Sequence, residues 1–168
     1  LAGVVDTRSG PLHEQRIRRI NLHGTAAVID ACVRAHVETL IFVSSATAVA
    51  DGVWGSDERA VRGEGAACAY GRAKAAAERL VLAAHGGVLS TVCVRPQMVF
   101  GPGDPLSTTD LLFAAVPPPT IGRGDRMATP IYVKNLAALL AVLPARLRDE
   151  RCVATRPLAG DGIGGSVL

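Results

Sequence analysis

The stretch Tyr70-Gly71-Arg72-Ala73-Lys74 begins an alanine-rich segment that predicts a helix running to about Ala84. Tyr70 and Lys74 are four residues apart, so on a helix they lie on one face. A nearby ammonium stabilises a phenolate, which lowers the pKa of the tyrosine and brings its hydroxyl closer to use as an acid or base at neutral pH. The pair therefore indicates proton transfer at a carbonyl or an alcohol, although this spacing also occurs on ordinary solvated helix faces.

A buried strand is predicted upstream of this helix. Residues 40–43 form a short, continuous apolar run, which is typical of a parallel strand covered on both faces. The run ends in the hydroxyl-bearing residues Ser44, Ser45 and Thr47. Open α/β sheets bind their ligands at the carboxyl ends of the strands, so we expect these hydroxyls at a ligand site.

Four motifs give residues 21–104 a resemblance to the extended short-chain dehydrogenase/reductase superfamily. This superfamily contains nucleotide-sugar epimerases and dehydratases and the 3β-hydroxysteroid dehydrogenases. The motifs occur in the order of the superfamily, as residues 21–25 (NLHGT), 43–47 (VSSAT), 70–74 (YGRAK) and 95–102 (RPQMVFGP). Their joint occurrence is far more specific than any one of them.

The resemblance implies a catalytic set of three residues and a nicotinamide cofactor, NAD or NADP. Tyr70 would be the acid/base, Lys74 its pKa-lowering partner and a ligand of the nicotinamide ribose, and Ser45 the hydroxyl that orients the substrate oxygen. Besides Tyr70 and Lys74, the residues implied at the cofactor are Leu1, Ala2, Gly3, Asn21, Pro96, Gln97, Met98 and Val99. Other interpretations stay open: a plain turn at Gly3, an uninvolved polar residue at Asn21, and a hydrophobic loop packed on the core at 97–99.

A long helix is predicted from about His13 to His36. Its apolar stripe, which one face of the sheet would cover, consists of Ile17, Ile20, Gly24, Val28 and Ala31. Glycine weakens a helix interior by about 1 kcal/mol relative to alanine, so we expect Gly24 to serve close packing on the sheet.

The remaining elements follow from apolar runs and from Gly and Pro. A second strand is predicted at 89–94, ended by Arg95-Pro96, and residues 85–87 (HGG) end the preceding helix. The other expected elements are a loop at 50–67 flanking the substrate cleft, a short helix at 111–114, a Gly-x-Gly turn at 121–125, a strand at 131–133, a helix at 135–143 and a frayed, glycine-rich tail at 153–168.

These elements predict an α/β fold: the second half of a Rossmann-like, doubly wound parallel sheet, followed by the start of a smaller substrate-binding region. We place the two parts at residues 1–105 and 106–168. The superfamily begins with a strand and a glycine-rich turn that holds the dinucleotide pyrophosphate, and no such turn precedes residue 1. We therefore interpret the chain as an amino-truncated piece of a longer enzyme.

Composition excludes several other classes. The 168 residues are 49% hydrophobic and 20% charged with a net charge of +3, which argues against disorder and against a nucleic-acid-binding surface. No run is long enough for a membrane span. Neither the cysteines nor the histidines have metal-type spacing, so we expect no metal and a reducing, cytoplasmic location.

The predicted function is NAD(P)-dependent hydride transfer between nicotinamide and a small-molecule alcohol or ketone. Residues 131–136 (IYVKNL) resemble 3β-hydroxysteroid dehydrogenase-like members, which favours a sterol-like 3β-hydroxy substrate. The alternatives are a nucleotide-sugar epimerase or dehydratase, and an inactive fragment or non-catalytic Rossmann-like binding module. We further expect a homodimer that forms through the helices around 13–36 and 68–85.

Overall fold

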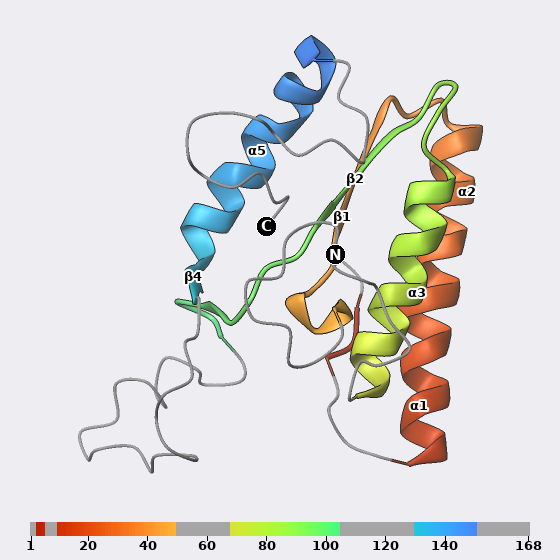
Figure 1. The fold of residues 1–168 in the computed structure, drawn as a ribbon, viewed down its shortest axis with the longest axis vertical. Helices are drawn as coiled ribbons and strands as arrows, with labels where there is room; N and C mark the ends of the chain where they lie inside the picture. Colours follow the sequence, from red (N-terminus) through yellow and green to blue (C-terminus); the bar gives the residue numbers. More distant parts are fainter. Residues whose placement is uncertain (1–2, 6–9, 50–67, 105–129, 151–168) are drawn as a thin grey trace.

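Two parallel strands lie between helices on both faces of the molecule (Figure 1). The computed structural model describes residues 3–5, 10–49, 68–104 and 130–150. Strand β1 (Thr39–Val43) pairs in parallel with β2 (Ser90–Val94), with Thr39 opposite Ser90 and Val43 opposite Val94. This confirms the predicted α/β fold with parallel strands, and both strands begin within one residue of their predicted positions.

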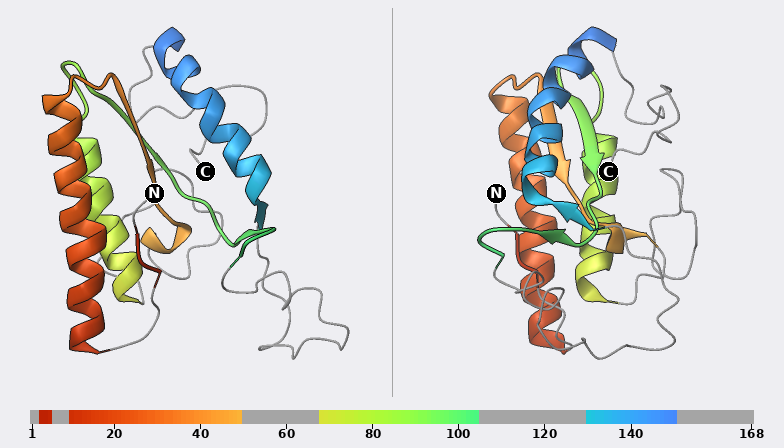
Figure 2. Two further views of the ribbon diagram at one scale, coloured as in Figure 1. Left: turned by 180° about the vertical axis from the view of Figure 1, so that it is seen from behind. Right: turned by 90° about the vertical axis from the view of Figure 1, so that its left-hand side faces the viewer.

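One face of this strand pair is covered by α3 (Ala69–Ala83) and a long helix beside it, and the other by α5 (Val133–Glu150) (Figure 2). The long helix is continuous and consists of α1 (Pro11–Ile17), the π-helical turn η1 (Arg18–His23) and α2 (Gly24–Arg34). Pro11 occupies its first turn, where the missing N–H of proline is not needed. The predicted helix at 13–36 is therefore confirmed, with a local π turn in its middle.

The face that this long helix buries departs from the predicted stripe. Ile17 is buried as expected, but Val28 is 49% exposed and Ala31 is also exposed. A π turn holds an extra residue. After η1 the partly buried positions of the helix are Gly24, Thr25, Ile29 and Cys32, so the last two fall one residue later than predicted. The expected close packing of Gly24 on the sheet is wrong, because a Cβ at this position would meet no atom of another segment within 4 Å.

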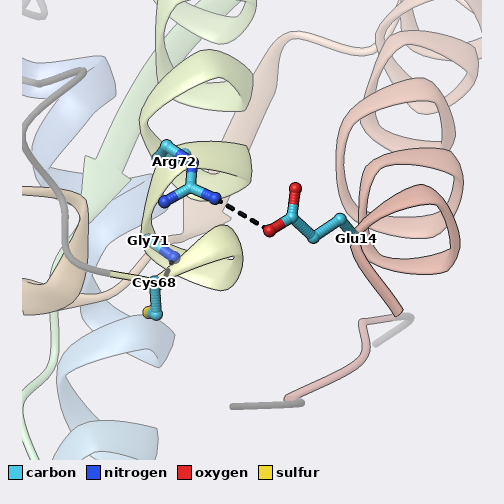
Figure 3. A network of polar contacts seen from close by, with 4 residues as sticks. All are labelled: Glu14, Cys68, Gly71 and Arg72. Carbon is cyan, nitrogen blue, oxygen red and sulfur yellow. Dashed lines mark hydrogen bonds and ion pairs between the residues drawn. The ribbon is translucent and has the colours of Figure 1, made fainter. Parts of the chain in front are cut away.

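Helix α3 has clear signals at both ends. The Cys68 thiol caps its first turn by accepting a hydrogen bond from the Gly71 N–H at 3.4 Å (Figure 3). At the other end α3 stops at Ala83, one residue before the predicted end, and Gly87, with a φ of 57°, lies in the turn that follows, where Gly86 pairs with Leu89. Small buried side chains at Ala73, Ala75 and Ala77 allow neighbouring elements to approach closely.

A second pair of short parallel strands leads into α5. Strand β3 (Val99–Phe100) pairs with β4 (Ile131–Tyr132), and the rings of Phe100 and Tyr132 lie 5.6 Å apart. Buried residues Leu136 and Leu143 of α5 pack against Val94 of β2 to form the core on this face. The predicted strand at 131–133 is thus confirmed over two residues. The predicted end of the next helix at 143 is wrong, because α5 continues through Pro144 to Glu150.

Gly101 joins β3 to the following turn under steric constraint. Its φ is 141°, and a Cβ there would lie 2.7 Å from Val133 Cγ1 and 2.9 Å from Tyr132 Cε2. We expect Gly101→Ala to lower the free energy of unfolding of the chain by about 1–3 kcal/mol, through backbone strain and overpacking. Urea denaturation of the 168-residue chain measures this loss.

Gly103→Ala is the matched control for that substitution. Gly103 also has a positive φ, 86°, but a Cβ there would meet nothing within 4 Å. The Gly103→Ala variant therefore reports backbone strain without a steric contact of the new Cβ. We expect it to lower the free energy of unfolding less than Gly101→Ala does. Equal losses for the two variants would show that the contact with Tyr132 and Val133 costs nothing.

Several predicted features lie outside the described residues: the loop at 50–67, the short helix at 111–114, the turn at 121–125 and the tail at 153–168. The division of the chain at residue 105 therefore stays a prediction. Among the residues that the structure does describe, no helix is long and apolar enough to cross a membrane. The same residues contain no group of three His, Cys, Asp or Glu side chains arranged to hold a metal ion.

Candidate active site

Ser45 lies just after β1 and begins a single 3-10 turn, η2 (Ala46–Ala48). Its hydroxyl accepts hydrogen bonds from the backbone N–H of Thr47 at 3.3 Å and from the Thr47 hydroxyl at 2.9 Å. The Ala46 N–H donates to Pro96 O at 3.1 Å, which ties this turn to the loop that follows β2. Ser45 is therefore held at the carboxyl end of the strand pair, as the predicted sheet required.

Tyr70, in the first turn of α3, lies near Ser45, whose side chain acts on the pKa of the Tyr70 hydroxyl. Burial raises the pKa of the Tyr70 hydroxyl above its ordinary value, the side chain of Ser45 lowers it in part, and the nearby Cys68 raises it. The net direction is upward, which is opposite to the expected lowering by Lys74. In this structure Tyr70 is therefore protonated at neutral pH and can act as a proton donor.

Lys74 lies one turn further along the same face of α3. Its ammonium donates a hydrogen bond to Val43 O at 2.8 Å and lies 4.8 Å from the ring centroid of Phe42 and 5.9 Å from that of Tyr70. Burial lowers the pKa of Lys74, and the negative charge of Glu78 acts in the opposite direction. The structure thus brings Ser45, Tyr70 and Lys74 together at the end of β1.

Asn21 is buried inside η1, where it is 3% exposed, and holds the chain near its start. Its side-chain Oδ1 accepts from the Val4 N–H at 2.9 Å, and its Nδ2 donates to Val4 O at 2.8 Å. The Thr25 hydroxyl donates to the Asn21 carbonyl at 2.7 Å. Asn21 thus fixes the backbone at Val4, next to Gly3, while Leu1 and Ala2 lie outside the described residues.

We expect Asn21→Ala to lower the free energy of unfolding by about 1–3 kcal/mol, because the partly buried N–H and C=O of Val4 would lose both partners at once. The shift of the urea midpoint of the chain measures this effect. Asn135→Ala, at an exposed position on α5, is the control and should move the midpoint little. If the two variants unfolded at the same urea concentration, the two hydrogen bonds to Val4 would contribute no stability.

The loop after β2 contains the other residues expected at the cofactor. Pro96 is buried, whereas Gln97 and Met98 are exposed, and Met98 has a φ of 41°. Val99 begins β3 and packs against the core around Val94. Val99 therefore fits the alternative interpretation of a loop packed on the core. That Gln97 and Met98 contact the cofactor stays a prediction.

Two residues near this site were missed from the sequence: Glu78 and Arg95. Glu78 forms a buried ion pair with Arg95. Two signals were available for the pair: Glu78 follows Lys74 by four residues on the same helix face, and Arg95 follows a strand directly. Next to Ser45, the buried Ser44 hydroxyl has no hydrogen-bond partner among the described residues.

Comparisons with known proteins agree with this geometry. The sequence model of the 3-beta hydroxysteroid dehydrogenase/isomerase family matches residues 1–158. The chain is 37% identical over 143 residues to 3beta-hydroxysteroid-dehydrogenase/decarboxylase isoform 1 of Arabidopsis thaliana, a match that covers 81% of this chain and 31% of the relative. It is also 37% identical over 110 residues to the decarboxylating sterol-4-alpha-carboxylate 3-dehydrogenase of Saccharomyces cerevisiae, which covers 61% and 32% of the two chains.

Among solved structures, MoeE5 in complex with UDP-glucose and NAD is similar with a TM-score of 0.70 and 29% identity, covering 89% of this chain and 52% of that one. UDP-glucuronic acid 4-epimerase from Bacillus cereus, in complex with UDP-glucuronic acid and NAD, has a TM-score of 0.70 at 18% identity, covering 92% and 50%. The second likeness shows the fold alone. The chain thus spans about a third of the length of these curated relatives and about half that of the solved neighbours.

Proposed function

Because the chain belongs to the 3-beta hydroxysteroid dehydrogenase/isomerase family, we propose that the protein that carries it oxidises the hydroxyl of a sterol-like 3β-hydroxy compound to a ketone. The family predicted from the four motifs is thereby confirmed, and so is the expectation of a nicotinamide cofactor at the level of the family. The bound nicotinamide would accept the hydride released from the alcohol carbon.

The observation that carries the proposal is the set of Ser45, Tyr70 and Lys74 at the end of β1. In oxidation, the deprotonated Tyr70 oxygen, which forms at higher pH, takes the proton of the alcohol, and in the reverse direction the protonated phenol returns it. The Ser45 hydroxyl, held by Thr47, orients the substrate oxygen beside Tyr70. Lys74 stabilises negative charge as it develops on the Tyr70 oxygen.

The hydrogen-bond donors of Ser45, Tyr70 and Lys74 suit the hydroxyl groups of the ribose that carries the nicotinamide. An ammonium has three N–H groups, and Val43 O takes one of them, so Lys74 has the chemistry to bind ribose hydroxyls as well. Hydroxyls at Ser45 and Tyr70 add neutral donors and acceptors in the same place. We assign the ribose contact to Lys74, and expect Gln97 and Met98 to line the nicotinamide side.

For the substrate class we propose a 3β-hydroxysteroid with a carboxyl group at the neighbouring carbon, as the names of the relatives indicate for those proteins. Oxidation of the hydroxyl would then create a β-keto acid. Such an acid loses CO₂ readily, because the electron pair of the broken bond passes into the new carbonyl as an enolate, which takes up a proton. The chain would need to supply only the oxidation step.

The test is an assay of the full-length protein with NAD⁺ and a 4-carboxylated 3β-hydroxysteroid. NADH formation and CO₂ release are followed together, with the same steroid lacking the carboxyl group and UDP-glucose as comparison substrates. We expect both products from the carboxylated steroid and neither from UDP-glucose. Turnover of UDP-glucose alone would favour the nucleotide-sugar alternative, and no turnover of any alcohol would favour the inactive fragment or binding module.

We also propose that two copies associate through the helices around 13–36 and 68–85. The support is a set of exposed apolar side chains on these helices, namely Leu12, Val28, Val33 and Leu80. Sedimentation of the full-length protein tests this, and a monomer at all concentrations would exclude it. The cytoplasmic location is likewise a proposal, based on the scattered cysteines.

A further inference from the structure

A buried ion pair joins α3, one turn beyond Lys74, to the residue that follows β2. Glu78 on α3 is fully buried, with 0% of its surface exposed, and the Arg95 side chain is 11% exposed. The guanidinium of Arg95 binds the carboxylate with two hydrogen bonds, Nε to Oε1 at 2.9 Å and Nη2 to Oε2 at 2.8 Å. This two-bond geometry fixes the carboxylate in position as well as neutralising it.

The position of Glu78 relates it to the catalytic pair. Tyr70, Lys74 and Glu78 follow one another at intervals of four residues, so they lie on one face of α3. Removing water from an ammonium disfavours its charged form unless an anion is near. The carboxylate of Glu78 is such an anion, one helical turn away from Lys74.

We propose that Glu78 is a positioning residue for Lys74: its buried carboxylate stabilises the positive charge of the Lys74 ammonium, and Arg95 holds that carboxylate in place. The partly buried group formed by Lys74, Glu78 and Arg95 then carries a net charge of +1. The importance of this for turnover rests on the proposed function, whereas the effect on the charge of Lys74 does not.

Other charged groups around α3 are placed differently. The helix that packs against it carries His13, Glu14, Arg16, Arg18, Arg19, His23, Asp30 and Arg34, all at least partly exposed. Glu14 on α1 pairs with Arg72 of α3 at 3.2 Å, on the side of α3 that faces α1, and both side chains are exposed (Figure 3). The thiols of Cys32, Cys68 and Cys93 are partly buried, and Lys134 and Arg146 belong to α5 on the opposite face of the strands.

A purely structural role would not require charge here. Replacing a buried ion pair by apolar side chains of similar volume often leaves stability unchanged or raises it. A charged pair at this place is therefore explained better by what it does for a neighbouring charge. Arg95 also precedes Pro96, whose carbonyl accepts a hydrogen bond from the Ala46 N–H beside Ser45. The Glu78–Arg95 pair therefore links α3, which carries Tyr70 and Lys74, to the loop that contacts the Ser45 turn.

The experiment measures the ionisation of Lys74 by NMR in the 168-residue chain labelled with ¹³C-lysine. The sequence contains two lysines, Lys74 and Lys134, so two side-chain signals are expected, and Lys134 on α5 is an internal reference. In Glu78→Gln, which keeps the shape and removes the charge, we expect the titration midpoint of Lys74 to fall by about 0.5–1 pH unit, a three- to tenfold change in its ionisation constant. Glu78→Asp, which keeps the charge, should give a midpoint between those of Glu78→Gln and the unaltered chain.

Glu14→Gln is the matched control, because it removes a carboxylate that pairs with Arg72, an exposed arginine on α3, the helix that also carries Lys74. It should leave the midpoint of Lys74 unchanged. Unfolding would hydrate Lys74 and move its midpoint upward, opposite to the expected shift, so loss of the fold cannot imitate the effect. An unchanged or higher midpoint in Glu78→Gln overturns the proposal, and if that variant does not fold, a Glu78→Asp midpoint equal to that of the unaltered chain overturns it as well.

Discussion

Replacement of Tyr70 by phenylalanine in the full-length protein should lower kcat by about two to four orders of magnitude and leave NAD affinity close to that of the unaltered protein. Phenylalanine keeps the ring that lies 5.9 Å from the Lys74 ammonium and removes the hydroxyl that lies near Ser45. The proton of the substrate alcohol would then have no acceptor in the site. Steady-state turnover together with a separate titration of NAD binding measures the two effects.

The chain offers a matched control for this substitution. Tyr132 is the other tyrosine in the sequence, and its ring packs against Phe100 away from the catalytic set. Tyr132→Phe should keep kcat within a few fold, because the ring contact is retained. A Tyr70→Phe protein with near-normal kcat would show that Tyr70 is not the acid/base.

Lys74→Met should weaken NAD binding by about 10- to 100-fold, since a hydrogen bond to a charged group contributes about 1.5–3 kcal/mol. It should also move the pH range of oxidation upward. Burial already raises the pKa of Tyr70, and the nearby ammonium favours its phenolate form, so removing that cation raises the pKa further. Loss of the proton then requires a higher pH. The pH dependence of kcat/KM and NAD titration check the two parts.

Lys134→Met is the control for the loss of a lysine, because Lys134 is exposed at the start of α5. It should change neither NAD affinity nor the pH profile. A Lys74→Met protein with normal NAD affinity and an unshifted profile would contradict both roles of Lys74. A loss of NAD affinity without a shift of the pH profile would support the contact of Lys74 with the ribose and exclude its effect on the pKa of Tyr70.

Elements with strong local signals could be predicted from the sequence. The apolar runs of β1 and β2 and the glycine stop after α3 placed these elements within about one residue, because their patterns depend on neighbouring residues only. The meeting of Tyr70 and Lys74 followed from the helix spacing, whereas Ser45 was placed beside them by the resemblance to the extended short-chain dehydrogenase/reductase superfamily. The end of α5 was missed because buried Leu143 and Leu147 favour continuing the helix, which outweighs the local effect of Pro144.

Features that depend on contacts between distant segments were not predictable in the same way. Nothing in the period of the apolar residues marked the extra residue of η1, so the prediction of the partly buried face of α2 was wrong by one position from Val28 onward. The raised pKa of Tyr70 has a similar origin, because it reflects how deeply the residue is buried rather than its spacing from Lys74. The Glu78–Arg95 pair required knowing how closely α3 approaches the end of β2.

The crossover from β1 through α3 to β2 has a consequence for how such a protein can evolve. Ser45, Tyr70, Lys74, Glu78 and Arg95 all belong to this one crossover or to the residues directly after it. The residues proposed for proton transfer therefore lie in one contiguous segment of the chain, from residue 45 to residue 95. Such a segment can be inherited as a unit, so sequence changes in β3, β4 and α5 leave these residues in place.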